Sequence, residues 1–285
     1  DNNIAIGYDA MDLSYIDDTQ DALTVNNIFI GKDAGGGDWA TAASHSNVGI
    51  GSGVMDAIMN GALSNVGVGT STLTTLTQGD SNTAIGSDSM TLVLTGGENT
   101  AVGASSLYTN STTSYSTAVG AGSLYSNVAE GNTAIGYHSL FSNSSGSNNV
   151  GVGFNAGKFA TTADKSTFIG ESAAQGLTGT KLTGNSNTAV GYNAGLLLQG
   201  TAAYNIYIGS ECADAQTTGD DNIAIGYAAM GNSTGTAADK NIFIGNYCGD
   251  GIGGNDVEGV TAVGYAAASG VITDAANGAV AIGRE

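Results

Sequence analysis

Few side chains in this sequence are suited to catalysis. A nucleophile needs a general base beside it, and the histidines that could serve are His45 and His138. His138 follows Tyr137 in a variable part of the chain, and we expect it to face solvent. His45 shares residues 35–46 with the only tryptophan, Trp39, so Trp39 and His45 are the candidates for a ligand-contacting loop. The competing interpretation is a solvated bulge.

The two cysteines, Cys212 and Cys248, each lie three residues after a glycine of the repeat described below. They are two repeats apart, which at about 4.8 Å per repeat separates them by about 10 Å. A disulfide requires a much shorter Cα–Cα distance. We therefore expect two small, buried, unpaired side chains.

Acidic residues cluster at Asp17–Asp18, at Asp220–Asp221 and over residues 250–258. Paired carboxylates can hydrolyse glycosidic bonds, but nothing in the sequence orders these as acid and base, so solvated loops are the simpler interpretation. Residues 251–256 partly match the calcium-binding nonapeptide of parallel β-rolls. Calcium is thus the one cofactor alternative, and otherwise we expect no cofactor and no enzymatic activity.

The charge balance excludes two classes of partner. The formal net charge is −19, with 25 acidic residues and only six lysines and arginines. Nucleic acids and anionic membrane surfaces bind through clustered basic side chains, so neither is expected here. No apolar run approaches the roughly 20 residues that span a bilayer, and we expect no membrane insertion in this segment.

A tandem repeat organises the whole chain. The string Asn-x-Ala-Ile/Val-Gly recurs 16 times with a common spacing of 17 residues. Its closing glycines are Gly7, Gly31, Gly51, Gly69, Gly86, Gly103, Gly120, Gly136, Gly153, Gly170, Gly191, Gly209, Gly226, Gly245, Gly264 and Gly283. This period is too short for helical hairpins and indicates one coil of a β-solenoid. The sequence therefore predicts an all-β fold, a parallel β-solenoid of about 16 short coils over residues 1–285, as one domain and as a segment of a longer fibre protein.

Each position of the repeat predicts an environment. The residue before the glycine is always Ile or Val, and the residue two before that is always Ile, Val or Thr. Because alternate residues of a strand share a face, we expect these two positions to line the coil interior. The residue between them is small or aromatic, such as Ala84 or Phe29. We expect it to face a neighbouring chain, with a homotrimer closing the set, and Ala84→Glu or Ala134→Glu to prevent assembly.

Three further positions carry structural expectations. The glycine suits a corner that needs a positive φ or a close backbone approach. The small residue three positions later and the following Leu or Met, such as Leu107, are interpreted as a second short strand. Asparagine lies four residues before the glycine in 12 repeats, and stacked amides can hydrogen-bond as a ladder.

Runs such as Asn132-Thr-Ala-Ile-Gly-Tyr-His-Ser-Leu140 and Asn222-Ile-Ala-Ile-Gly-Tyr-Ala-Ala-Met230 resemble known repeats. They are similar to the head repeats of YadA-type trimeric autotransporter adhesins and, more closely, to repeats of bacteriophage tail fibres. The resemblance implies a left-handed parallel β-roll with three chains about one axis. The period here is longer than the usual adhesin head repeat.

The functional expectation is a structural fibre of a phage tail, located in the virion, that attaches to a host cell-surface glycan or protein. The alternatives are the head of a bacterial trimeric surface adhesin, located extracellularly on the cell surface, and a polysaccharide-degrading tail spike. An ice-binding solenoid is set aside because the stacked threonines are expected to face inward. We expect receptor contacts from the longer spacings at residues 8–26, 35–46 and 171–186.

Overall fold

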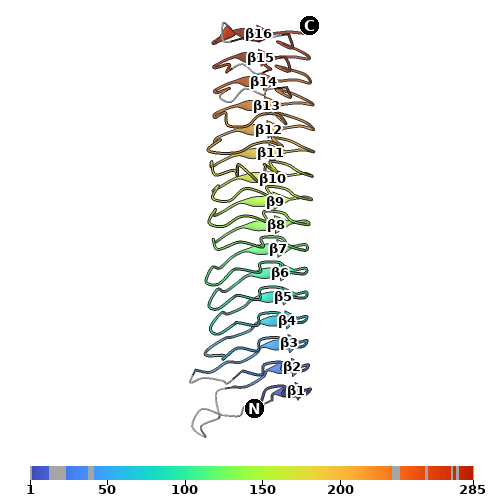
Figure 1. Cartoon of the computed structure of the whole chain (residues 1–285), viewed down its shortest axis with the longest axis vertical. Coiled ribbons are helices and arrows are strands. Elements are labelled where there is room, and N and C mark those ends of the chain that lie inside the picture. The colour runs from blue at the N-terminus through green and yellow to red at the C-terminus, as the bar shows by residue number, and fades with distance from the viewer. Residues whose placement is uncertain are drawn as a thin grey trace. The chain divides into compact units, whose positions relative to one another are not determined.

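The structure is a computed structural model that describes residues 2–12, 24–37, 42–232, 238–253, 256–270, 272–273 and 276–284. Within these residues it contains sixteen short β-strands and no α-helix. The chain forms two compact units, Asp1–Tyr137 and His138–Glu285, and each is built from the same repeat (Figure 1). No helix that could span a membrane occurs in the described ranges.

Each repeat supplies one three-residue strand that ends just before the repeat glycine. The strands of the first unit are β1 (Ile4–Ile6), β2 (Ile28–Ile30), β3 (Val48–Ile50), β4 (Val66–Val68), β5 (Thr83–Ile85), β6 (Thr100–Val102), β7 (Thr117–Val119) and β8 (Thr133–Ile135). Those of the second unit are β9 (Val150–Val152), β10 (Thr167–Ile169), β11 (Thr188–Val190), β12 (Ile206–Ile208), β13 (Ile223–Ile225), β14 (Ile242–Ile244), β15 (Thr261–Val263) and β16 (Val280–Ile282).

Within each unit the strands pair in parallel and in chain order, so that equivalent repeat positions lie directly above one another. Ala84 of β5 pairs with Ala101 of β6, and Phe243 of β14 pairs with Ala262 of β15. Backbone hydrogen bonds continue beyond the strands, as from the amide of Gly103 to the carbonyl of Ile85 at 2.7 Å. The predicted parallel β-solenoid is confirmed.

The two faces of the strands are the reverse of the prediction. The middle residue is buried in every strand from β2 to β15, and Phe29, Ala84 and Phe243 are each fully buried inside their own coil. The flanking Thr, Ile and Val residues are half-buried or exposed instead. Ile85, for example, is 41% exposed. The expectation that Ile and Val line the interior, and that Ala84 and Ala134 face another chain, was therefore wrong.

The narrow coil explains this reversal. Its interior must also hold the Leu or Met that follows the glycine by four residues, and Leu73, Met90, Leu107 and Leu124 are fully buried. A small residue in the strand leaves room for that side chain, whereas two β-branched residues would not. Burial of each such leucine contributes about 1.5–3 kcal/mol, so the core forms within one chain rather than between chains.

The expected second strand is absent from the described residues, and turns take its place. Leu107, Leu124 and Leu140 have φ values of 48°, 49° and 47°, in the left-handed region that bulky residues rarely adopt. The turns still bond from coil to coil, as from the amide of Leu107 to the carbonyl of Ser123 at 3.0 Å. Burial and these hydrogen bonds offset a backbone strain of about 1–2 kcal/mol per residue.

The repeat glycine satisfies both predicted requirements. Gly86 has a φ of 130°, and a Cβ placed on it would lie 2.6 Å from the carbonyl carbon of Gly103 in the next coil. Gly209 is equivalent, with a φ of 139° and a Cβ position 2.3 Å from the carbonyl oxygen of Gly226. No side chain fits at either position, so these repeats need their glycine.

The asparagine ladder is confirmed. Oδ1 of Asn65 accepts hydrogen bonds from both the backbone amide and the side-chain amide of Asn82, at 2.9 and 3.0 Å. The same pattern joins Asn205 to Asn222 in the second unit. Asn82 also donates to the carbonyl of Gly96 at 2.8 Å. Each buried amide thus fastens one coil to the next and closes a turn within its own coil.

Candidate functional site

The outward face of the strands carries an extensive exposed apolar surface in each unit. In the first unit Ile50, Ile85 and Ile135 are 40%, 41% and 42% exposed. In the second unit Ile169 and Ile208 are 39% and 38% exposed. Because the strands stack in register, these side chains form a continuous apolar column along each unit, which soluble monomers rarely leave open to water.

A second column of the same face carries threonine in four successive strands. Thr83, Thr100, Thr117 and Thr133 pair in register across β5 to β8, and each is half-buried. They point outward beside Ile and Val. The reason for setting ice binding aside, that these threonines face the interior, is therefore incorrect.

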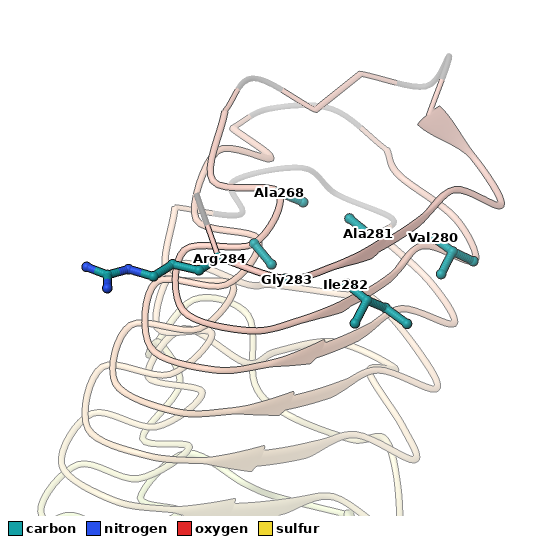
Figure 2. A pocket seen from close by; sticks show the side chains of 7 residues that line it. Ala268, Val280, Ala281, Ile282, Gly283 and Arg284 are labelled. Atoms are coloured by element: carbon teal, nitrogen blue, oxygen red, sulfur yellow. The ribbon is translucent and has the colours of Figure 1, made fainter.

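The end of β16 shows the two strand faces side by side. Figure 2 shows Val280 and Ile282 projecting from one side of the strand and Ala281 from the other, toward Ala268. These residues line a hollow together with Ala267, Gly283 and Arg284. Apart from Arg284 its lining side chains are apolar or absent, so the hollow offers no group for acid–base or nucleophilic chemistry.

Of the two residues proposed for a ligand-contacting loop, Trp39 lies outside the described residues. His45 is half-buried in the coil-to-coil framework, where its carbonyl accepts a hydrogen bond from the amide of Ser64 at 3.1 Å. Its Nδ1 lies 3.2 Å from the hydroxyl of its neighbour Ser46. His45 therefore belongs to the regular ladder rather than to a projecting loop.

His138 is half-buried rather than projecting freely into solvent. Its ring lies 4.4 Å from that of Phe141, measured between centroids. Burial, with a smaller contribution from the positive charge of Lys158, lowers the pKa of His138. Both effects favour the neutral form of the imidazole, which lies beside an aromatic ring.

The two cysteines behave as predicted. Cys212 and Cys248 are fully buried and unpaired. Their sulfur atoms lie 3.1 and 3.2 Å from the carbonyl oxygens of Ala224 and Ala262, each in the next coil. Burial raises the pKa of the Cys212 thiol to about 12, which makes it a poor nucleophile.

Asp220 and Asp239 bind the backbone of neighbouring coils. Oδ1 of Asp220 accepts a hydrogen bond from the amide of Ala203, and Oδ1 of Asp239 accepts one from the amide of Asp220, both at 2.8 Å. Asp17 and Asp18 lie outside the described residues, as do residues 254–255 of the partial calcium motif. Among the residues that can be placed, no three His, Cys, Asp or Glu side chains form a group that could hold a metal ion.

Of the three longer spacings, residues 171–186 are described completely. Residues 177–181 form an exposed loop, and Leu177 is 45% exposed. The chain then returns at Leu182, which is fully buried and bridges to Ala160 and Gly200. The insertion thus forms a loop, as expected, while parts of residues 8–26 and 35–46 lie outside the described ranges.

Sequence reasoning missed a row of aromatic side chains in the second unit. Tyr227, Tyr247 and Tyr265 belong to three successive coils and are 39%, 37% and 50% exposed. Their ring centroids are separated by 5.2 and 6.0 Å in edge-to-face contacts. The available signal was aromatic residues one or two positions after the repeat glycine.

No protein-family model, no curated protein and no solved structure matches this chain.

Proposed function

We propose that this chain is a structural segment of a homotrimeric phage tail fibre that attaches the virion to a host cell surface. The observation that carries the proposal is the outward column of Ile and Val on the strands of each unit. Each coil contributes one Ile or Val to this column, such as the exposed Ile85 and Ile135, and successive coils are about 4.8 Å apart. Covering such a stripe removes it from water, and three copies about one axis close without open-ended growth.

The backbone supports a mechanical role. Coil-to-coil hydrogen bonds and the asparagine ladder make each coil a template for the next, which suits a fibre that transmits force. The repeats resemble both phage tail fibres and adhesin heads, so an adhesin head of a bacterial surface is the alternative. Binding of the purified chain to bacterial cells supports the fibre, whereas binding to extracellular-matrix proteins supports the adhesin.

The assembly is tested by Ile85→Lys, which places a charge on the outward column. Leu94→Lys is the matched control, because Leu94 is also 41% exposed but lies outside the strand. Light scattering should give three times the 28.0 kDa protomer mass for the wild type and for Leu94→Lys. Ile85→Lys should give the protomer mass with an unchanged circular dichroism spectrum.

A wild-type mass of one protomer would overturn the trimer. The threonine column would then be open to solvent, and a thermal hysteresis measurement would test ice binding. A trimeric Ile85→Lys variant would show that the assembly uses another surface.

A further inference from the structure

The position directly after the repeat glycine alternates in chemistry along the second unit. The residue is aromatic in the repeats that contain β9, β11, β13 and β15, and it is polar in the repeats between them. The aromatic residues are Phe154, Tyr192, Tyr227 and Tyr265, with exposed fractions of 49%, 47%, 39% and 50%. The polar residues are Glu171, Ser210 and Asn246. Tyr247, one position further on, fills the gap between Tyr227 and Tyr265.

The spacing of this aromatic row follows from the fold. Paired strands of consecutive coils lie about 4.8 Å apart, so aromatic residues two coils apart recur about every 9.6 Å. That interval is close to the length of two linked pyranose rings. An extended polysaccharide lying along the row would therefore present equivalent sugars to successive aromatic side chains.

The backbone beneath the row is held rigidly. The amide of Tyr247 donates to the carbonyl of Tyr227 at 2.8 Å, and the amide of Tyr227 donates to Oδ1 of Asn246 at 3.0 Å. The guanidinium of Arg284 lies 5.3 Å from the ring centroid of Tyr265. A ligand that binds here finds the rings already positioned, which reduces the entropy lost on binding.

The local charge selects among ligands. A hydrogen bond to Glu211 and its negative charge raise the pKa of the Tyr227 phenol. Glu171 in the row and Glu211 beside Tyr227 outnumber Arg284, so an acidic polysaccharide would be repelled.

We infer that the aromatic row from Phe154 to Tyr265 binds an extended, neutral polysaccharide, with its sugar faces stacked on the rings and its hydroxyl groups hydrogen-bonded by the intervening polar side chains. Tyrosine supplies both a ring face and a hydroxyl group, so one side chain can stack on a sugar and hydrogen-bond to it. The inference rests on the attachment role proposed above and assigns the receptor contact to regular coils rather than to the longer loops.

The test is calorimetric titration of the full chain with cellohexaose and chitohexaose as neutral probes and with hexagalacturonate as the acidic probe. We expect at least one neutral hexasaccharide to bind and the acidic one to bind at least tenfold more weakly. Tyr227→Ala and Tyr265→Ala should each weaken binding at least tenfold. Tyr204→Ala is the matched control, since Tyr204 is 61% exposed but lies before a strand rather than after the glycine, and its affinity should stay within twofold.

Tyr227→Phe separates stacking from hydrogen bonding, because it keeps the ring and removes the hydroxyl group. This variant should retain most of the affinity. Absence of neutral-sugar binding, or unchanged affinity in Tyr227→Ala, would overturn the inference. A change in oligomeric mass of Tyr227→Ala would overturn it too, since the row would then be a contact between protomers. These results are independent of the Ile85→Lys experiment, so failure of the fibre proposal is recognised separately.

Discussion

The ring of Phe243 occupies the space in which a side chain on Gly249 would lie. A Cβ on Gly249 would stand 2.3 Å from Cδ1 of Phe243. Gly249 has a φ of 68°, but the backbone is not the reason for the glycine. Leu107 and Leu124 adopt similar positive φ values at the equivalent position of other coils. Glycine is required here because the aromatic ring fills the core.

A ring also meets a glycine at the other aromatic strand residues, within the same coil for Phe29 and from the next coil for Phe168 and Tyr207. The Cβ positions of Gly35, Gly157 and Gly195 lie 2.9, 2.4 and 3.0 Å from ring atoms of the aromatic residues that they accommodate. Those residues are Phe29, Phe168 and Tyr207. The coils of Ala101 and Ala118 carry a large residue there instead, Leu107 and Leu124. A large residue at one of the two positions is thus matched by a small one at the position that it contacts, in the same coil or in a neighbouring coil.

This complementarity predicts a rescue. Gly249→Leu should destabilise the second unit by at least about 1–3 kcal/mol through overpacking, and Phe243→Ala should cost about 3–5 kcal/mol through the cavity it leaves. The double variant recreates an alanine–leucine coil and should be more stable than the sum of the two changes predicts, by about 1–3 kcal/mol. Urea unfolding followed by circular dichroism measures all three.

Gly53→Ser is the control for that experiment. Gly53 has a φ of 62°, but a Cβ there would have no neighbour within 4 Å, and Ser71 holds the equivalent position with a φ of 53°. Its stability should change by less than about 1 kcal/mol. Additive effects of the Phe243 and Gly249 substitutions would contradict the proposed exchange of volume.

The asparagine ladder predicts a large cost for removing one amide. Oδ1 of Asn222 accepts the backbone and side-chain amides of Asn241, and its Nδ2 donates to the carbonyl of Ala238 at 2.6 Å. Asn222→Ala should cost about 1–3 kcal/mol for each buried partner left unsatisfied. Asn222→Ser should cost less, because Ser166 fills this position elsewhere and still accepts the amide of Asn187. Equal stability of the two variants would contradict the ladder's role.

The orientation of the strands predicts opposite outcomes at neighbouring residues. Ala84→Glu places a carboxylate in the fully closed interior of the coil and should prevent folding of the first unit, at a cost of about 3–5 kcal/mol or more. Ile85→Glu places the same carboxylate on the exposed face and should leave the protomer folded. Thermal unfolding by circular dichroism distinguishes them. If Ala84→Glu folds normally and only fails to assemble, Ala84 faces a neighbouring chain after all, as the repeat pattern first predicted.

The buried thiol of Cys212 predicts a loss of stability in alkali. Its folded-state pKa of about 12 exceeds the ordinary value of 9.0, so ionisation favours the unfolded chain. The stabilising contribution is complete below about pH 9 and is lost as the pH rises toward 12. Denaturant unfolding at successive pH values should show this decline, and Cys212→Ala should reduce it. In the folded state at neutral pH, the thiol should not react with Ellman's reagent.

Several features of this protein follow from its sequence alone. A period of 17 residues with an unvarying glycine predicts a β-solenoid, and a recurring asparagine predicts a ladder of buried amides. These features depend on local geometry. At Gly86 and Gly209 the backbone conformation and the neighbouring coil leave no room for a side chain. Asn65 needs only the equivalent asparagine of the next coil as its hydrogen-bond partner. Both Cys212 and Cys248 were likewise predicted to be buried and unpaired, because their repeat position holds small residues.

Tertiary structure alone decided which face of each strand is inside. Alternation shows that Thr83 and Ile85 share a face opposite Ala84, but it cannot show which face meets the core, because both faces carry apolar residues. The answer depends on Met90, which is fully buried in the same narrow coil as Ala84 and needs the room that a small strand residue leaves. The core volume of a coil is a property of the closed chain. For that reason the sequence pattern was consistent with both orientations, and packing selected one.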